Sequence, residues 1–172
     1  MTAIHLAAPG HADVDALLAF ELANRAFFES TINARPPWNS RRAVALAIEE
    51  AEKDRGYQFL VKSGAGDIVG RVNLSNVRRP HFHSAVLGYR IGESAGGKGY
   101  ASGAVRQVLD FAFGALGLLR IEADARAENL GSVRVLLRNG FVQFGHSRRS
   151  FELKGVWYDR LHFERHALTS TS

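Results

Sequence analysis

The feature that most constrains this chain is a glycine-rich turn, AGGKGYAS at residues 95–102, between a predicted strand and a predicted helix. Residues 87–91 (LGYRI) are typical of a strand, and residues 104–116 carry apolar side chains at helical spacing. Backbone N–H groups at the start of a helix lack helical partners, and the helix dipole is positive there, so anions bind. The turn therefore predicts a site for a phosphate-bearing ligand. The alternative is that the turn binds no ligand and is only a tight connection, which needs glycines because its residues have positive φ.

Spacing separates three classes of phosphate ligand that use such turns. Residues 92–98 fit the start of a mononucleotide P-loop, but Gly99 stands where that loop needs a Ser or Thr hydroxyl for magnesium. The dinucleotide pattern that starts at Gly97 needs a further glycine where the chain has Ser102. The third class is a coenzyme A loop of the form Gln/Arg-x-x-Gly-x-Gly/Ala. Residues 99–101 (GYA) match its last three positions, and we favour this class.

Composition favours one globular domain. A chain of 172 residues, 46% of them apolar, is long enough to bury a core of its own. The absence of cysteine excludes disulfides and thiolate metal sites, and no grouping of His, Asp and Glu has metal-binding spacing. No signal peptide or long apolar run is present. We expect a single domain over residues 1–168, a disordered tail over 169–172, no metal, no membrane association and a cytoplasmic location.

The net charge of +5 fits either nucleic acid or a small polyanionic ligand. Basic pairs occur only at residues 41–42, 78–79 and 148–149, without the interleaved aromatic residues that are typical of nucleic-acid recognition. These positions are therefore interpreted as solvated surface, and we expect no direct nucleic-acid partner.

The order of predicted elements defines a fold class. Strands are expected at 4–7, 57–62, 68–77, 83–91, 119–124, 141–144 continuing at 149–153, and 156–166. Helices are expected at 14–22, 41–53, 104–116 and 129–138, with a break at 33–39. This order predicts an α/β (α+β) fold, with a mostly antiparallel mixed sheet of about seven strands flanked by about four helices.

Several segments jointly resemble a known family. They are FHSAVLGYRIG at 82–92, ENLGS at 128–132, RNGF at 138–141 and GVWYD at 155–159. Together with the glycine-rich turn, these blocks resemble the GNAT superfamily, and within it the ribosomal-protein N-terminal acetyltransferases RimJ and RimL. The resemblance spans roughly residues 4–166. It implies acetyl-CoA as donor and a primary amine as acceptor, which attacks the thioester directly in a ternary complex.

The resemblance also implies which residues hold the coenzyme. Backbone amides of the turn should bind the pyrophosphate, and the chain at Ile91 should present an N–H to the thioester carbonyl as an oxyanion donor. Gly96 replaces the family's usual Gln or Arg, so one side-chain anchor is lost. The expected coenzyme contacts are Ile91, Gly97, Lys98, Gly99, Tyr100, Ala101, Ser102, Asn129 and Ser132.

Acid chemistry at the leaving thiolate points to one serine. Many GNAT enzymes have a tyrosine acid where this chain has Leu136, whereas the RimL-like pattern has a serine where this chain has Ser132. We expect Ser132 to be the proton donor or hydrogen-bond partner of the thiolate, with Asn129 as a coenzyme contact. The alternative is that both residues only cap the helix, because Asn and Ser favour first turns.

The general base is less clearly marked in the sequence. His83 and Glu93 flank the coenzyme loop, and Glu29 lies in the early helical region that forms an acceptor wall in this family. An N-terminal amine has a pKa of about 7.7–8.0 and is partly neutral near pH 7.5, whereas a lysine amine, near 10.4, needs a base. A poorly marked base therefore favours an N-terminal α-amine.

The predicted function is N-acetylation of a protein N-terminus of the ribosomal-protein type. The first alternative is a small amine acceptor, such as a polyamine, an antibiotic or an aminoacyl nucleotide. The second is a coenzyme A-binding module without catalysis. Trp38, with Phe27 and Phe28, is a candidate lining of the acceptor groove, and core packing is the alternative for the two phenylalanines.

Overall fold

The computed structural model describes residues 3–32, 40–53 and 56–168. The predicted break at 33–39, Trp38 and the predicted tail at 169–172 lie outside these ranges. In chain order the elements are β1 Ile4–Ala7, α1 Val14–Ala23, α2 Arg25–Glu29, α3 Arg41–Lys53, β2 Tyr57–Ser63, β3 Ile68–Arg78, β4 Ser84–Ile91, α4 Tyr100–Phe113, β5 Arg120–Arg126, α5 Leu130–Arg138, β6 Val142–Leu153 and β7 Val156–His166. Short 3₁₀ turns cover His11–Asp13 and Glu93–Ala95.

The strands form one seven-stranded sheet in the order β1-β2-β3-β4-β5-β7-β6. Every neighbouring pair is antiparallel except β4 and β5, which are parallel. The predicted fold class, a mostly antiparallel mixed sheet with flanking helices, is confirmed. Among the helices of the described ranges, none is long and apolar enough to cross a membrane.

Several elements differ from the sequence prediction in their bounds, and one helix was not predicted. Helix α4 begins at Tyr100 rather than at 104, because its half-buried first turn carries no apolar periodicity. The segment at 142–153 is one strand rather than two, since irregular pairing with β7 interrupts its alternation without ending it. The short helix α2 was not predicted, because five residues are too few to show helical periodicity.

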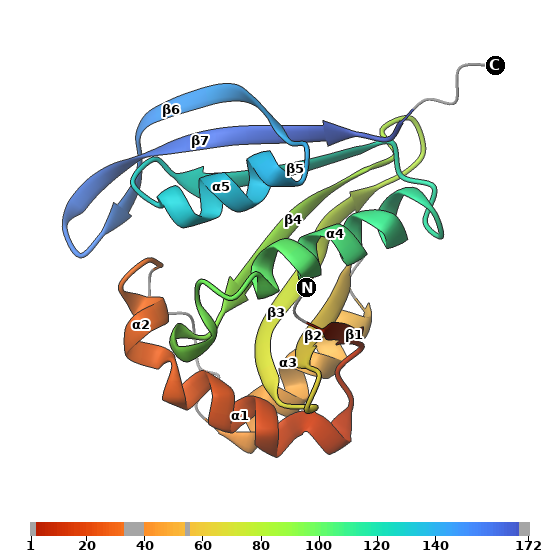
Figure 1. Ribbon diagram of the computed structural model, residues 1–172, viewed down its shortest axis with the longest axis vertical. Helices are drawn as coiled ribbons and strands as arrows, with labels where there is room; N and C mark the ends of the chain where they lie inside the picture. The colour runs from red at the N-terminus through yellow and green to blue at the C-terminus, as the bar shows by residue number, and fades with distance from the viewer. Residues whose placement is uncertain (1–2, 33–39, 54–55, 169–172) are drawn as a thin grey trace.

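Helices cover both faces of the sheet. Neighbouring residues of β2 show this, because Val61 packs in the core that contains Val105 of α4, whereas Leu60 packs with Leu17 of α1 and Val44 of α3. Successive side chains of a strand point to opposite faces. Helices α4 and α5 therefore lie on one face of the sheet and α1 and α3 on the other; Figure 1 shows α4 crossing in front of β3 and β4.

The parallel strands β4 and β5 separate part-way along their length. Pairing runs only from Ser84 opposite Arg120 to Val86 opposite Glu122, although β4 continues to Ile91 and β5 to Arg126. Figure 1 shows the two strands diverging toward their carboxyl ends. We call this gap the splay. Helices α4 and α5 begin just beyond it, so the fold places two helix N-termini and an open sheet edge together, where ligands of α/β proteins bind.

Candidate functional site

The glycine-rich turn adopts a conformation suited to anion binding. Gly97 has φ +72° and Gly99 has φ +82°, and Gly99 is the N-cap of α4. A Cβ at either position would contact nothing within 4 Å, so the backbone conformation rather than space requires glycine. The first helical bond runs from the Gly103 N–H to the Gly99 carbonyl. The N–H groups of Tyr100, Ala101 and Ser102 therefore lie at the open end of the helix.

The side chain of Ser102 joins the turn to helix α5 through a hydrogen bond. The buried Asn139 amide donates hydrogen bonds to the Ser102 hydroxyl (3.2 Å) and to the Val135 carbonyl (2.9 Å). These bonds join the first turn of α4 to the last turn of α5. The neighbouring Gly96 and Lys98 are exposed. The predicted loop residues thus gather at one helix start, with the hydroxyl of Ser102 already in a hydrogen bond to the protein.

Strand β4 orients the backbone of Ile91 toward the splay. Ile91 lies opposite Gly70 of β3, and the next residue, Gly92, donates its N–H to the Val69 carbonyl over 2.9 Å. In an antiparallel pair, bonded and non-bonded positions alternate. The N–H of Ile91 therefore points away from β3 and toward β5. This is the direction that an oxyanion donor at Ile91 requires.

The start of α5 separates the roles of two predicted residues. The Asn129 side chain accepts a hydrogen bond from the Ser132 N–H over 3.1 Å, which is an N-cap contact. The Ser132 hydroxyl, in contrast, lies 2.8 Å from the hydroxyl of Tyr89 on β4. Asn129 therefore caps the helix, whereas the Ser132 hydroxyl takes no part in capping and joins α5 to the strand beside the splay.

Tyr89 is a candidate functional residue that the sequence prediction did not include. Burial raises the pKa of Tyr89 to about 12, an effect that the Ser132 hydrogen bond partly offsets. The phenol thus stays protonated at any physiological pH. Period-two alternation places Tyr89 on the same side of β4 as Ile91, but its partner lies 43 residues away in sequence. No local pattern could have identified the pair.

A cavity of about 360 Å³ extends from Tyr89 and Ser132 to the opposite face of the sheet, and Ile91 and the glycine-rich turn are not among its lining residues. Tyr89, Asn129 and Ser132 line it on the side of α4 and α5, and Phe28 of α2 lines it on the other side. The volume is within the range of small-molecule sites. Phe28 is buried as well as cavity-lining, while Phe27 is partly exposed and does not line the cavity.

The face opposite α4 and α5 carries a buried cluster of charged side chains. Glu21 of α1, 8% exposed, accepts hydrogen bonds from Arg71 (3.0 Å) and Arg90 (2.7 Å). Arg71 also donates to Gln58 of β2 over 3.1 Å, and the Arg90 guanidinium lies 4.7 Å from the centre of the Phe28 ring. Both arginines line the cavity, and Glu21 holds them in place.

Strands β5 and β7 extend this charged face across the splay. Asp124 of β5 pairs with Arg160 of β7, and Arg126 of β5 stacks on the ring of Tyr158, 4.2 Å away. Asp124, Arg126 and Arg160 all line the cavity. The sequence prediction missed them because they are ordinary polar positions of half-buried strands, and only the sheet brings them beside Arg71 and Arg90.

The structure does not bring the candidate bases to the cavity. His83 lies beside the start of β4, the opposite end of that strand from Ile91, and its ring contacts Arg79. Glu93 is exposed in the turn after β4. Glu29 forms an ion pair with Arg25 on α2. None of the three lines the cavity.

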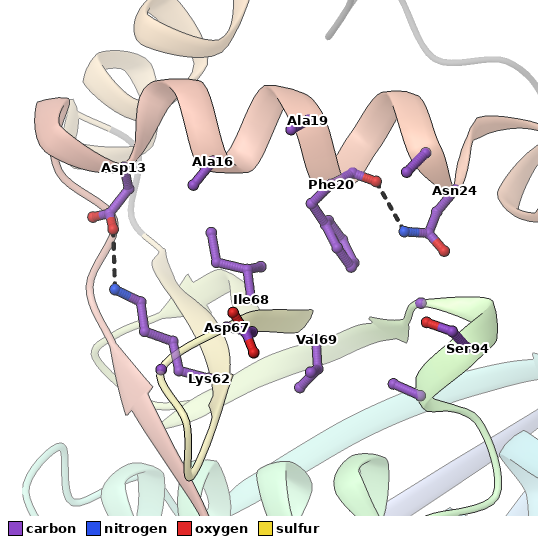
Figure 2. Close-up of a pocket in the computed structure, with 14 residues that line it drawn as sticks. Asp13, Ala16, Ala19, Phe20, Asn24, Lys62, Asp67, Ile68, Val69 and Ser94 are labelled. Atoms are coloured by element: carbon purple, nitrogen blue, oxygen red, sulfur yellow. Dashed lines mark hydrogen bonds and ion pairs between the residues drawn. The ribbon is translucent and has the colours of Figure 1, made fainter.

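A second, larger cavity of about 470 Å³ lies beneath α1 (Figure 2). Ala16, Ala19 and Phe20 of α1 form one wall, and an ion pair between Asp13 and Lys62 at 3.0 Å stands at one end. The cavity reaches Gly92 and Ala95, at the start of the coenzyme loop, but contains no residue of the splay. We therefore assign the chemistry to the smaller cavity.

The described part of the chain contains no group of three or more His, Cys, Asp or Glu residues that could hold a metal ion. The arrangement instead combines an anion-binding turn, a backbone N–H directed into a gap between strands, and a hydroxyl pair at that gap. These groups suit transfer of an acyl group from a phosphate-bearing thioester.

Comparisons with known proteins agree with this geometry. A family model described as Acetyltransferase (GNAT) domain matches residues 4–142. The chain is 37% identical over 153 residues to the probable N-acetyltransferase YjcK of Bacillus subtilis, a match that covers 86% of this chain and 84% of that protein. It is 33% identical over 95 residues to the ribosomal protein uS5-alanine N-acetyltransferase of Escherichia coli, covering 55% of this chain and 49% of that protein.

A solved structure extends the similarity to the whole fold. Mycobacterium smegmatis RimJ, in complex with CoA-disulfide, has a TM-score of 0.84 and 29% identity to this chain, covering 95% of this chain and 82% of that one. The family match spans most of the chain, and the turn and the splay fit a coenzyme A thioester. The protein therefore belongs to the GNAT family and is an acetyl-CoA-dependent N-acetyltransferase.

Proposed function

We propose that the acceptor is the N-terminal α-amine of a protein and that Ser132 and Tyr89 stabilise the leaving thiolate. The observation that carries the catalytic part is the 2.8 Å contact between the two hydroxyls in the wall of the splay cavity. The similarity to a uS5-alanine N-acetyltransferase supports the choice of acceptor.

The reaction needs one bond formed and one broken. The amine nitrogen attacks the thioester carbonyl carbon, and the Ile91 N–H donates to the developing oxyanion, which is worth about 3 kcal/mol in comparable sites. The C–S bond then breaks, sulfur leaves with the electron pair, and the nitrogen loses its proton to solvent. The products are an N-acetylated amine and free coenzyme A.

The pKa of Tyr89 determines what the hydroxyl pair contributes. Tyr89 has a pKa of about 12, whereas an ordinary thiol has one near 8.5. Complete proton transfer from Tyr89 to the thiolate is therefore uphill by about 5 kcal/mol. The pair instead acts by hydrogen bonding. The Tyr89 hydroxyl, which also lies 3.2 Å from the Ser132 carbonyl, donates to Ser132 Oγ, and the Ser132 hydroxyl donates to the sulfur. Solvent supplies the proton afterwards.

An α-amine acceptor needs no strong base at this site. With a pKa of about 7.8, about a third of such an amine is already neutral at pH 7.5. Among the described residues that line the cavity, Asp124 is the one carboxylate, and it is paired with Arg160. Deprotonation by water is sufficient for an α-amine but not for a lysine side chain.

The experiment follows coenzyme A release with a thiol reagent, for which a chain without cysteine gives no background. Acceptors are a peptide with a free N-terminal alanine and the same peptide with a blocked N-terminus and an internal lysine. We expect acetylation of the free N-terminus, located by mass spectrometry. Acetylation of the lysine peptide alone would refute the proposed acceptor.

The same assay tests the hydroxyl pair. Ser132→Ala should lower kcat about 30-fold, because a hydrogen bond to a charged group contributes about 2 kcal/mol, while the Kd for acetyl-CoA changes less than about threefold. Tyr89→Phe should lower kcat about tenfold, because Tyr89 acts through Ser132. If Ser132→Ala keeps full turnover, the role of this residue is only structural.

The second candidate acceptor is a small amine. Proteins similar to this chain are named for both kinds of acceptor, a ribosomal-protein alanine and spermidine. Spermidine and simple monoamines therefore belong in the same acceptor panel. Turnover with these compounds, and none with any N-terminal peptide, would favour the second candidate.

A further inference from the structure

Arg126 carries buried hydrogen-bond donors that are unused within the described part of the chain. Its Nε and Nη1 atoms are buried and have no hydrogen-bond partner there, and the side chain is 16% exposed. The carboxylate of Glu128 lies 4.0 Å from Nε, too far for a hydrogen bond. Stacking on Tyr158 satisfies the flat face of the guanidinium but none of its N–H groups. A guanidinium is always charged, and when its N–H groups are buried they rarely lack hydrogen-bond partners.

The rest of the cavity wall has the same positive bias. Besides Arg126, the described lining residues include Arg71, Arg90 and Arg160, and Asp124 as the one acidic residue. Asp124 is already bound to Arg160, and Arg71 and Arg90 share the carboxylate of Glu21 behind the wall. With Glu21 and Glu128 beside the lining residues, four arginines and three carboxylates leave an excess of one positive charge around this cavity. Such a wall repels a polycation and attracts an anionic group.

The positions of these groups give the acceptor an orientation. Tyr89 and Ser132 mark the side of the splay where the thiolate leaves. Arg126 lies on β5 across the gap, on the face opposite α5, because the adjacent Ala125 is buried in the core beneath α5. When the amine of an acceptor enters the splay, the part of the acceptor next to that amine therefore lies toward Arg126.

We propose that the acceptor carries an anionic oxygen group close to its reactive amine and that the guanidinium of Arg126 binds this group. The inference rests on the proposed function, since it specifies the acceptor of that same site. The anionic group has two possible sources: an acidic side chain in the first residues of a protein N-terminus, or the carboxylate of a small amine. Both present the planar pair of oxygens that arginine binds through two N–H groups.

Matched acceptor pairs test the proposal. One pair is a peptide that begins Ala-Glu and the same peptide beginning Ala-Gln; the other is β-alanine and β-alaninamide. We expect the wild-type protein to show at least a tenfold higher kcat/KM for the acidic member of the pair that it accepts. The peptide pair reports an acidic N-terminus, and the small pair reports a carboxylate-bearing small amine.

Substitutions at Arg126 test whether this residue causes the preference for the acidic acceptor. Arg126→Gln should lower kcat/KM for the acidic acceptor at least tenfold and leave the neutral acceptor within about threefold, whereas Arg126→Lys should retain part of the preference. Arg106→Gln, which removes an exposed charge on α4, should change neither acceptor. Urea unfolding of each variant separates loss of folding from loss of recognition.

The two proposals fail in different ways. Turnover of the small pair without the peptide pair refutes the protein acceptor, while a preference for β-alanine over its amide still supports the role of Arg126. Equal kcat/KM for acidic and neutral members of an accepted pair, or an equal loss for both in Arg126→Gln, would overturn the anionic-acceptor inference. Faster turnover of spermidine than of any acidic acceptor would also overturn it.

Discussion

The two sides of the splay are built from different kinds of chemical group. On the side of α4 and α5, the site consists mainly of backbone N–H groups and small residues from two short stretches, residues 91–102 and 129–132. On the side of α1 and α3, it consists of charged side chains from β3, β4, β5 and β7, with Glu21 of α1 behind them. We infer that a side built from local backbone geometry suits an invariant ligand, the coenzyme, and that a side built from dispersed side chains suits a variable one, the acceptor.

The largest effect is expected on the charged side. Glu21→Gln removes the buried carboxylate that Arg71 and Arg90 share, and breaking a buried charge cluster costs about 3 kcal/mol or more. Urea unfolding at pH 7.5 measures this loss. The control is Glu29→Gln, whose exposed pair with Arg25 is worth about 0.5 kcal/mol or less. Equal losses in the two variants would show that the cluster has no special energetic role.

The next effect is a loss of stability at alkaline pH caused by Tyr89, which lies at the boundary between the two sides. Because the pKa of Tyr89 is raised to about 12 in the folded protein, its contribution to stability is complete below the unfolded pKa of about 10 and is lost as the pH rises through 12. The loss amounts to about 3 kcal/mol. It is measured as the difference in alkaline unfolding between the wild-type protein and Tyr89→Phe. An identical decline in both proteins between pH 10 and 12 would contradict a buried phenol.

A smaller effect is expected on the backbone side. Gly99→Ala and Gly155→Ala place a Cβ at φ +82° and φ +80° with open space around each. Both should lose about 1 kcal/mol of stability, because alanine disfavours this conformation. Only Gly99→Ala should weaken acetyl-CoA binding, by about tenfold, since it distorts the start of α4. Calorimetric titration measures the affinity of each variant for acetyl-CoA. Equal affinities would show that the turn does not contribute to coenzyme binding.

The smallest effect tests whether Asn129 is structural. Asn129→Ala removes the N-cap of α5 and should cost about 1 kcal/mol of folding stability. The Kd for acetyl-CoA should change less than about threefold, because the side-chain oxygen already accepts the Ser132 N–H. A large loss of affinity with unchanged stability would instead identify Asn129 as a direct coenzyme contact, as the family resemblance implied.

Particular residues show what sequence reasoning could reach. The order of strands and helices follows from local periodicity, and the predicted fold class is confirmed for that reason. The glycines of the coenzyme turn could be identified because positive φ at Gly97 and Gly99 is a requirement on single residues. Glu93 and His83 were selected for their nearness to that turn in sequence, and the structure places both outside the cavity.

The sequence by itself therefore determined the longer helices, the order of the strands along the chain and the anion-binding turn, since each depends on interactions within a few residues. Only the tertiary structure decided which side chains meet across the splay. The Tyr89–Ser132 pair joins residues 43 positions apart, and the Glu21–Arg90 pair joins residues 69 apart. Such contacts arise from the register of β4 against its neighbours and the packing of α1 and α5 on opposite faces, and no local pattern encodes them.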